Sequence, residues 1–240
     1  MRELHLFTGG GGGVLGGILL GHACVCAVEI EPHCRKILLQ RQRDGILPKF
    51  PIWDDVKTFD GKPWRGLVDV IHAGFPCTGV SAARSNSKTN GALVGIGGAG
   101  SELWEEIPRI AGECGYPDLF IENSPRLLTR GLVTIIKRLN ADGYVGKWCS
   151  LGAGHFGADH ERVRLWLKAT HPNGPQRQRG ELSSGAHEEH KDFSGAGWWK
   201  DKPGLERVAN DVPNQMVRLK AIGNAQVCGV AAFAWRGLSL

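Results

Sequence analysis

The 240-residue sequence has no long, uninterrupted hydrophobic stretch. Its longest apolar run, residues 14–20, is broken by glycine and is too short to span a bilayer. The residues after Met1 are not followed by the apolar core and cleavage site of a secretory signal. These absences argue against membrane insertion and secretion, so we expect a cytoplasmic protein without a membrane partner.

The sequence also lacks the motifs of a metal site and of a phosphate-binding loop. The cysteines number seven and are scattered, which in a reducing compartment indicates free thiols rather than a disulfide framework. Cys24 and Cys26 are expected to share one face of a strand. No cysteine or histidine spacing matches a zinc site, so we expect no metal. No Gly-Lys-Ser/Thr is present, which argues against a P-loop.

The chain does contain enough apolar residues, 42%, for one large domain or a domain with a small appendage. Strands are expected at residues 4–8, 25–28, 67–72, 117–121, 145–151 and 163–167. Helices are expected at residues 31–43, 101–114 and 129–139 and after residue 224. This alternation, with five glycines after the first strand, predicts an α/β fold with a parallel doubly wound sheet. The net charge of +5 is compatible with nucleic-acid binding but does not demonstrate it.

Residues at the ends of the first three strands suggest a nucleotide-type ligand. Glycines let the backbone approach a ligand, and the N–H groups of a helix start face it. Glu29 follows Gly9 by 20 residues, the offset at which a carboxylate accepts bonds from ribose hydroxyls. A carboxylate at the start of the next helix is the alternative. Asp55 is placed to receive an adenine amino group, or else to form a turn or helix cap.

Three further groups carry reactive chemistry. Cys77 stands where a core strand gives way to a glycine- and serine-rich loop; a buried structural cysteine is the alternative. Glu122 ends the next strand and is a candidate proton handler, because burial raises a carboxyl pKa. Arg162 and Arg164 lie two residues apart and are expected to share a strand face, although solvated arginines show the same spacing.

In order and spacing, these motifs resemble those of the cytosine-5 DNA methyltransferases, especially the compact bacteriophage and prophage kind. The resemblance covers nearly the whole chain, except about residues 170–202. His5, Thr78, His160 and Cys228 stand where Asp, Gln, Gln and Pro are usual. The matching segments are residues 4–12, 27–30, 55–56, 74–77, 122–124, 160–164 and 223–225.

The resemblance implies a Rossmann-like S-adenosylmethionine-dependent methyltransferase fold. It implies S-adenosyl-L-methionine as cofactor and S-adenosyl-L-homocysteine as product. Cys77 would attack C6 of a flipped-out cytosine, Glu122 would hold N3 and the exocyclic amine, and Arg164 would bind O2. Arg162 would support the loop or a phosphate. The residues implied to bind the cofactor are Phe7, Gly9, Gly10, Gly11, Glu29, Ile30, Asp55, Val56, Pro76 and Asn224.

The expected organisation is a catalytic and cofactor-binding domain at residues 1–169, a small target-recognition region at 170–213, and a segment at 214–240 that returns to the catalytic domain. Double-stranded DNA is the expected partner of a monomer, in a restriction-modification or bacteriophage setting. The alternatives are a tRNA-type RNA methyltransferase, a catalytically silent nucleic-acid binder and a Rossmann dehydrogenase. Candidate DNA contacts are Ser81, Gln176, Arg177 and Arg179.

Overall fold

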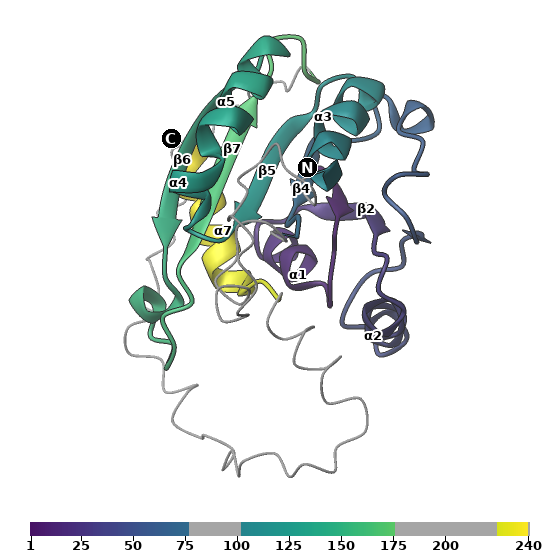
Figure 1. Ribbon diagram of the computed structural model, residues 1–240. Helices are drawn as coiled ribbons and strands as arrows, with labels where there is room; N and C mark the ends of the chain where they lie inside the picture. Colours follow the sequence, from purple (N-terminus) through teal and green to yellow (C-terminus); the bar gives the residue numbers. More distant parts are fainter. Residues whose placement is uncertain (77–101, 176–224, 240) are drawn as a thin grey trace, which may run out of the picture.

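A seven-stranded sheet forms the centre of the structure, a computed structural model that describes residues 1–76, 102–175 and 225–239 (Figure 1). The strand order is β3-β2-β1-β4-β5-β7-β6. All neighbours from β3 to β5 are parallel, whereas β7 is antiparallel to both β5 and β6. The expected mostly parallel α/β sheet is confirmed. The strands are β1 (Arg2–Leu6), β2 (Ala23–Val28), β3 (Ile52–Trp53), β4 (Val70–Ala73), β5 (Asp118–Asn123), β6 (Val145–Leu151) and β7 (Arg164–Thr170).

Helices cover both faces of the sheet, as a doubly wound fold requires (Figure 1). One face packs against α3 (Glu102–Cys114), α4 (Leu127–Arg130) and α5 (Leu132–Ala141). The other face packs against α1 (Gly12–Leu19), α2 (Pro32–Arg43) and α7 (Cys228–Ser239). None of the described helices is long and apolar enough to cross a bilayer. The described residues also form two short 3-10 helices, η1 (Lys62–Trp64) and η3 (Ala153–Phe156).

Strand β1 shows how the alternation of side chains builds both layers. Leu4 and Leu6 point to the α3 side and belong to the largest apolar cluster. Glu3 and His5 point to the opposite side, where they are 3% and 2% exposed. Strand β1 therefore contributes two apolar side chains to the hydrophobic core on one face and two buried polar side chains on the other.

Two expectations about local structure are wrong. The β1–β2 register pairs Glu3 with Cys24 but Leu4 with Cys26, so that Val25 is skipped. Cys24 consequently packs beneath α1 and α2, while Cys26 joins the cluster on the other face. The single helix expected at residues 129–139 is two helices, because Gly131 separates α4 from α5 with an extended φ of 175°.

Helix α1 packs so closely on its surroundings that its glycines have no room for a side chain. A methyl group on Gly12 would lie 2.3 Å from the carbonyl oxygen of Gln226, and one on Gly16 would lie 3.0 Å from Cβ of Ala231. A methyl group on Gly17 would lie 2.1 Å from Oε2 of Glu3. These contacts bring the residues before and within α7 directly against the first helix.

Replacing Gly17 with alanine tests this packing. Alanine favours the helix by about 1 kcal/mol over glycine, but here its methyl group meets a carboxylate that two imidazoles hold in place. We expect G17A to lower the free energy of unfolding by about 2 kcal/mol or more, as overpacking does. Chemical denaturation measures the change.

Gly229→Ala is the matched control, because Gly229 lies exposed in α7 with open space around the added methyl group. We expect this variant to be as stable as the parent or more stable by up to about 1 kcal/mol. Equal effects of the two substitutions would show that α1 is not tightly packed.

Candidate active site

A small pocket opens at the carboxyl ends of β1 and β4, the edge at which parallel α/β sheets bind their ligands. Phe7 turns the chain out of β1 with a left-handed φ of 57°, a costly conformation for a residue other than glycine. The pocket thus lies between the glycine turn and the segment after β4. Its lining residues are His5, Leu6, Phe7, Thr8, Gly13, His72, Gly74 and Gln226.

Glu29 ties the glycine turn to the end of β2. Its Oε2 accepts a hydrogen bond from the N–H of Gly9 at 2.6 Å, and its Oε1 accepts one from the N–H of Glu31 at 2.8 Å. Glu31 is the residue that caps α2, so the carboxylate does lie at a helix start. It also lies beside the glycine turn, as a ribose-binding acid would, and both interpretations of the sequence describe its position.

The remaining residues expected to bind the cofactor are less closely grouped. Ile30 is 66% exposed after β2. Asp55 accepts the N–H of Lys57 at 2.9 Å and so behaves as a turn acid. The side chain of Val56 is buried in the main apolar cluster, and its carbonyl accepts a bond from Arg109. The carbonyl oxygen of Gly10 accepts a hydrogen bond from Arg41. Gly11 is the N-cap residue of α1, and Pro76 is exposed.

Glu122 is the acid of the site, and it is 8% exposed near the end of β5. Nε of Arg164 lies 2.9 Å from its Oε1, and Nε2 of Gln226 donates to its Oε2 at 3.3 Å. The antiparallel course of β7 makes this possible, because the beginning of β7 meets the carboxyl end of β5. Burial raises the pKa of Glu122, and the charge of Arg164 offsets only part of that effect.

Arg162 does not share a strand face with Arg164, and that expectation is wrong. Strand β7 begins at Arg164, and Arg162 precedes it in a left-handed conformation with φ of 33°. Its Nη2 donates instead to the carbonyl oxygen of Ala225. Arg162 therefore anchors the backbone next to Gln226.

Asn123 joins the acid to the segment that leads to Cys77. Its Nδ2 donates to the carbonyl oxygen of Phe75 at 3.2 Å, while its Oδ1 accepts the N–H of Ser124 at 2.7 Å. A methyl group on Gly74 would lie 3.1 Å from Oε2 of Glu122, so the two segments touch. Outside the described residues lie Cys77, Ser81, Gln176, Arg177, Arg179 and Asn224.

The comparison with protein families is decisive. A model of the C-5 cytosine-specific DNA methylase family matches residues 1–225. This chain belongs to that family.

The chain is similar to Type II methyltransferases over part of their length. It is 32% identical to M.CviJI of Paramecium bursaria Chlorella virus IL3A over 169 residues, and 28% identical to M2.BsuMI of Bacillus subtilis over 177 residues. These matches cover 70% and 71% of this chain but only 42% of each relative. The chain thus spans less than half the length of these relatives.

Solved structures agree on the fold. A mutant of Spodoptera frugiperda DNMT2 aligns with a TM-score of 0.55 and 18% identity, covering 75% of this chain and 53% of that one. A prophage-encoded Escherichia coli protein described as a DNA modification methyltransferase aligns with a TM-score of 0.54 and 21% identity. This alignment covers 71% of this chain and 47% of that one. The expected Rossmann-like methyltransferase fold is confirmed.

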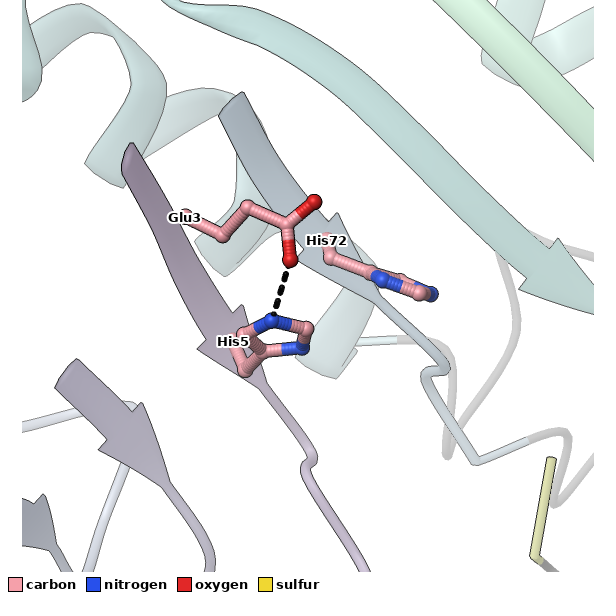
Figure 2. A group of neighbouring side chains, drawn as sticks. All are labelled: Glu3, His5 and His72. Carbon is pink, nitrogen blue, oxygen red and sulfur yellow. Dashed lines mark hydrogen bonds and ion pairs between the residues drawn. The ribbon is translucent and has the colours of Figure 1, made fainter. Parts of the chain in front are cut away.

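Beneath the pocket lies a buried charged group that the sequence analysis missed (Figure 2). Oε2 of Glu3 lies 2.8 Å from Nε2 of His5, and Oε1 lies 2.7 Å from Nδ1 of His22. His72, on the neighbouring strand β4, places its ring centroid 4.9 Å from that of His5. Ligand-type atoms of Glu3, His5 and His72 lie within 4.8 Å of one another, but two imidazoles already engage the carboxylate. The available signal was the pair of polar residues at alternating positions of β1.

The lowered pKa values of Glu3 and His72 make the folded state more stable at neutral pH than in acid. Burial by itself raises the pKa of Glu3, but the hydrogen bonds with His22 and His5 outweigh it and hold the pKa below its ordinary value. Burial, reinforced by the proximity of His5, lowers the pKa of His72 to about 3. His72 is therefore neutral at pH 7, and its Nε2 has no hydrogen-bond partner among the described residues.

Acid should weaken the fold through His72. A histidine with a depressed pKa binds its proton more readily when unfolded, so its contribution is complete above about pH 6.5 and declines as the pH falls toward 3. Between pH 7.5 and 5 this loss amounts to about 2 kcal/mol. We expect denaturation at the two pH values to show a clearly smaller loss for His72→Met than for the parent, and equal losses would contradict the buried neutral imidazole.

Proposed function

We propose that this chain carries the catalytic site of an S-adenosylmethionine-dependent DNA (cytosine-5)-methyltransferase. The observation that supports it most strongly is the junction at Glu122. The buried carboxylate pairs with Arg164 and contacts Gly74, three residues before Cys77. The same junction borders the pocket beside the glycine turn. An acid, a guanidinium and the segment that leads to Cys77 thus meet beside this small pocket.

The residues around the pocket suit S-adenosylmethionine. Phe7 would lie beside the adenine and the turn Gly9–Gly11 around the methionine part, while Glu29 would hold the ribose and Ile30 would pack against the adenine. The side-chain oxygen of Gln226 lies beside His72 at the pocket, and an amide oxygen can accept a second hydrogen bond there from a ligand. When bound, the cofactor supplies a methyl group on a positively charged sulfur.

The chain's own residues make the cytosine reactive. The thiolate of Cys77 would add to C6 of the base, which would turn C5 into an enamine-like carbon nucleophile able to take the methyl group from the sulfur. Loss of the C5 proton to water would then let the thiolate leave. Glu122 holds N3 and the exocyclic amine, and its raised pKa allows it to share a proton with the ring. Arg164 stabilises charge on O2.

Four other thiols of the chain are poor nucleophiles. Burial raises the pKa of Cys26 and of Cys114 to about 12, and it raises that of Cys24 still further. Cys149 is half-buried on β6, and burial raises its pKa as well. These thiols remain protonated at neutral pH, which supports Cys77 as the nucleophile.

The proposed substrate is cytosine in double-stranded DNA, flipped out of the helix because C6 is unreachable inside the stack. Residues 170–213 would form a small target-recognition region, with Ser81, Gln176, Arg177 and Arg179 as contacts. Residues 214–240 would return the chain to the catalytic domain, and the enzyme would act as a monomer. A restriction-modification setting follows from the Type II names of its relatives.

Substitution of the thiol tests the mechanism. We expect Cys77→Ala to abolish methyl transfer to duplex DNA while leaving the Kd for S-adenosyl-L-homocysteine within about twofold, because the thiol acts on the base. Tritium transfer from labelled cofactor and isothermal titration calorimetry provide the two measurements. Cys149→Ser is the matched control and should retain turnover.

A trapping experiment identifies the bond and the substrate class. Duplex DNA with 5-fluorocytosine should form a stable adduct with the parent and with Cys149→Ser, but not with Cys77→Ala. Turnover by Cys77→Ala would refute the mechanism. Labelling of tRNA in preference to duplex DNA would assign the same chemistry to RNA.

A further inference from the structure

The side chain of Gln226 occupies a space that three glycines leave open. A methyl group on Gly13 would lie 2.6 Å from its Oε1, and one on Gly74 would lie 2.8 Å from its Nε2. A methyl group on Gly12 would collide with its carbonyl oxygen. Two of these glycines lie at the start of α1 and the third in the segment after β4, so Gln226, two residues before α7, is packed between the two sides of the pocket.

The two ends of this amide face different partners. Nε2 donates to Oε2 of Glu122 at 3.3 Å, whereas Oε1 lies beside the ring of His72, whose side chain shares a hydrogen bond with the amide. An amide oxygen has two lone pairs, so one is left to accept a hydrogen bond from a ligand in the pocket that Gln226 lines. The backbone just before it is held by Arg162 through the carbonyl of Ala225. The amide is therefore held firmly while its oxygen can still accept a hydrogen bond from a ligand.

The layout of the pocket identifies the ligand group. Glu29, the proposed ribose partner, lies at the end of β2, whereas Gln226 and Gly74 lie on the β4 side of β1. The sulfur that carries the methyl group joins the ribose to the amino-acid part of the cofactor, and it would have to approach the base held by Glu122. The amino-acid part would then extend toward β4. Its α-ammonium is a hydrogen-bond donor suited to an amide oxygen.

We propose that Gln226 is a positioning residue whose Oε1 accepts the α-ammonium of the methyl donor while its Nε2 orients Glu122. This inference rests on the proposed function and adds a residue to it. Binding of the donor fixes the amide with its NH2 group toward the acid, because the reversed amide would direct an oxygen at the carboxylate. Donor binding and placement of the acid are thereby coupled through one side chain.

The coupling has an electrostatic consequence. Among the described residues, the charged groups that act on Glu122 are Arg164 and Arg162, and both favour its ionised form, as does the amide of Gln226. The hydrogen bond from the amide lowers the pKa of Glu122, whereas burial raises it. Removal of the amide therefore raises the pKa of Glu122 further. Whichever protonation state catalysis needs, the limb of the pH–rate profile that reports Glu122 moves to higher pH.

Ligand-binding measurements on the chain test the role of Oε1. We expect Gln226→Leu to raise the Kd of S-adenosyl-L-homocysteine about tenfold, while the Kd of 5′-methylthioadenosine, which lacks the amino-acid part, stays within about twofold. Gln226→Glu keeps an acceptor oxygen and should bind S-adenosyl-L-homocysteine at least as tightly as the parent. Gln40→Leu, on the exposed face of α2, is the matched control and should change neither Kd.

Kinetics test the nitrogen. Gln226→Leu should lower kcat about tenfold at saturating cofactor and shift one limb of the pH–rate profile upward. Gln226→Glu should lower kcat further despite intact binding, since it sets a second carboxylate against Glu122. Circular dichroism and thermal unfolding confirm that each variant is folded.

Two results would overturn the inference. One is an equal change in Kd for both ligands, which would place the amino-acid part elsewhere. The other is a kcat and pH–rate profile of Gln226→Leu that match those of Gln40→Leu. Failure of the proposed function looks different, because the parent itself would then transfer no methyl group to duplex DNA.

Discussion

The structure depends on the close approach of α1 to its neighbours. Gly12, Gly16 and Gly17 present bare backbone to Gln226, Ala231 and Glu3, at separations that exclude a β-carbon. A conventional amphipathic helix would hold α7 and the preceding residues several ångströms farther away. The acid at the end of β5 would then lose its amide partner, and the pocket would lose one wall. Glycine is thus needed in this helix for packing, and not only for the close approach to a ligand that glycine turns usually allow.

Two buried carboxylates illustrate two electrostatic solutions within one sheet. Glu3 is surrounded by imidazoles and held ionised, which makes it a structural charge. Glu122 has a guanidinium and an amide as partners, yet burial still raises its pKa. Groups whose protonation is finely balanced in this way are typical of catalytic sites. The difference follows from position, because Glu122 borders the opening at the strand ends while Glu3 lies beneath α1.

Much of this arrangement could be predicted from the sequence, and the failures have physical causes. Alternating strands and helices, the glycine turn, and Glu29 and Glu122 at strand ends are local features, so periodicity reveals them. The opposite faces of Cys24 and Cys26 depend on a skipped residue in the β1–β2 register, which only the partner strand decides. The turn at Arg162 and the contact of Gln226 with Glu122 join distant segments. No local pattern signals such pairings.

The contact between α1 and α7 also has a consequence for folding during synthesis. The ribosome makes α1 and β1 early, but the segment at residues 225–239 that covers them emerges more than two hundred residues later. Until then the nascent chain exposes the glycine surface of α1, and Glu122 lacks its amide. Since domains acquire their packing as they leave the ribosome, the surroundings of Glu122 are complete only once residues 225–239 have been made and have docked against α1. The order of synthesis therefore delays the assembly of this site relative to the sheet that carries it.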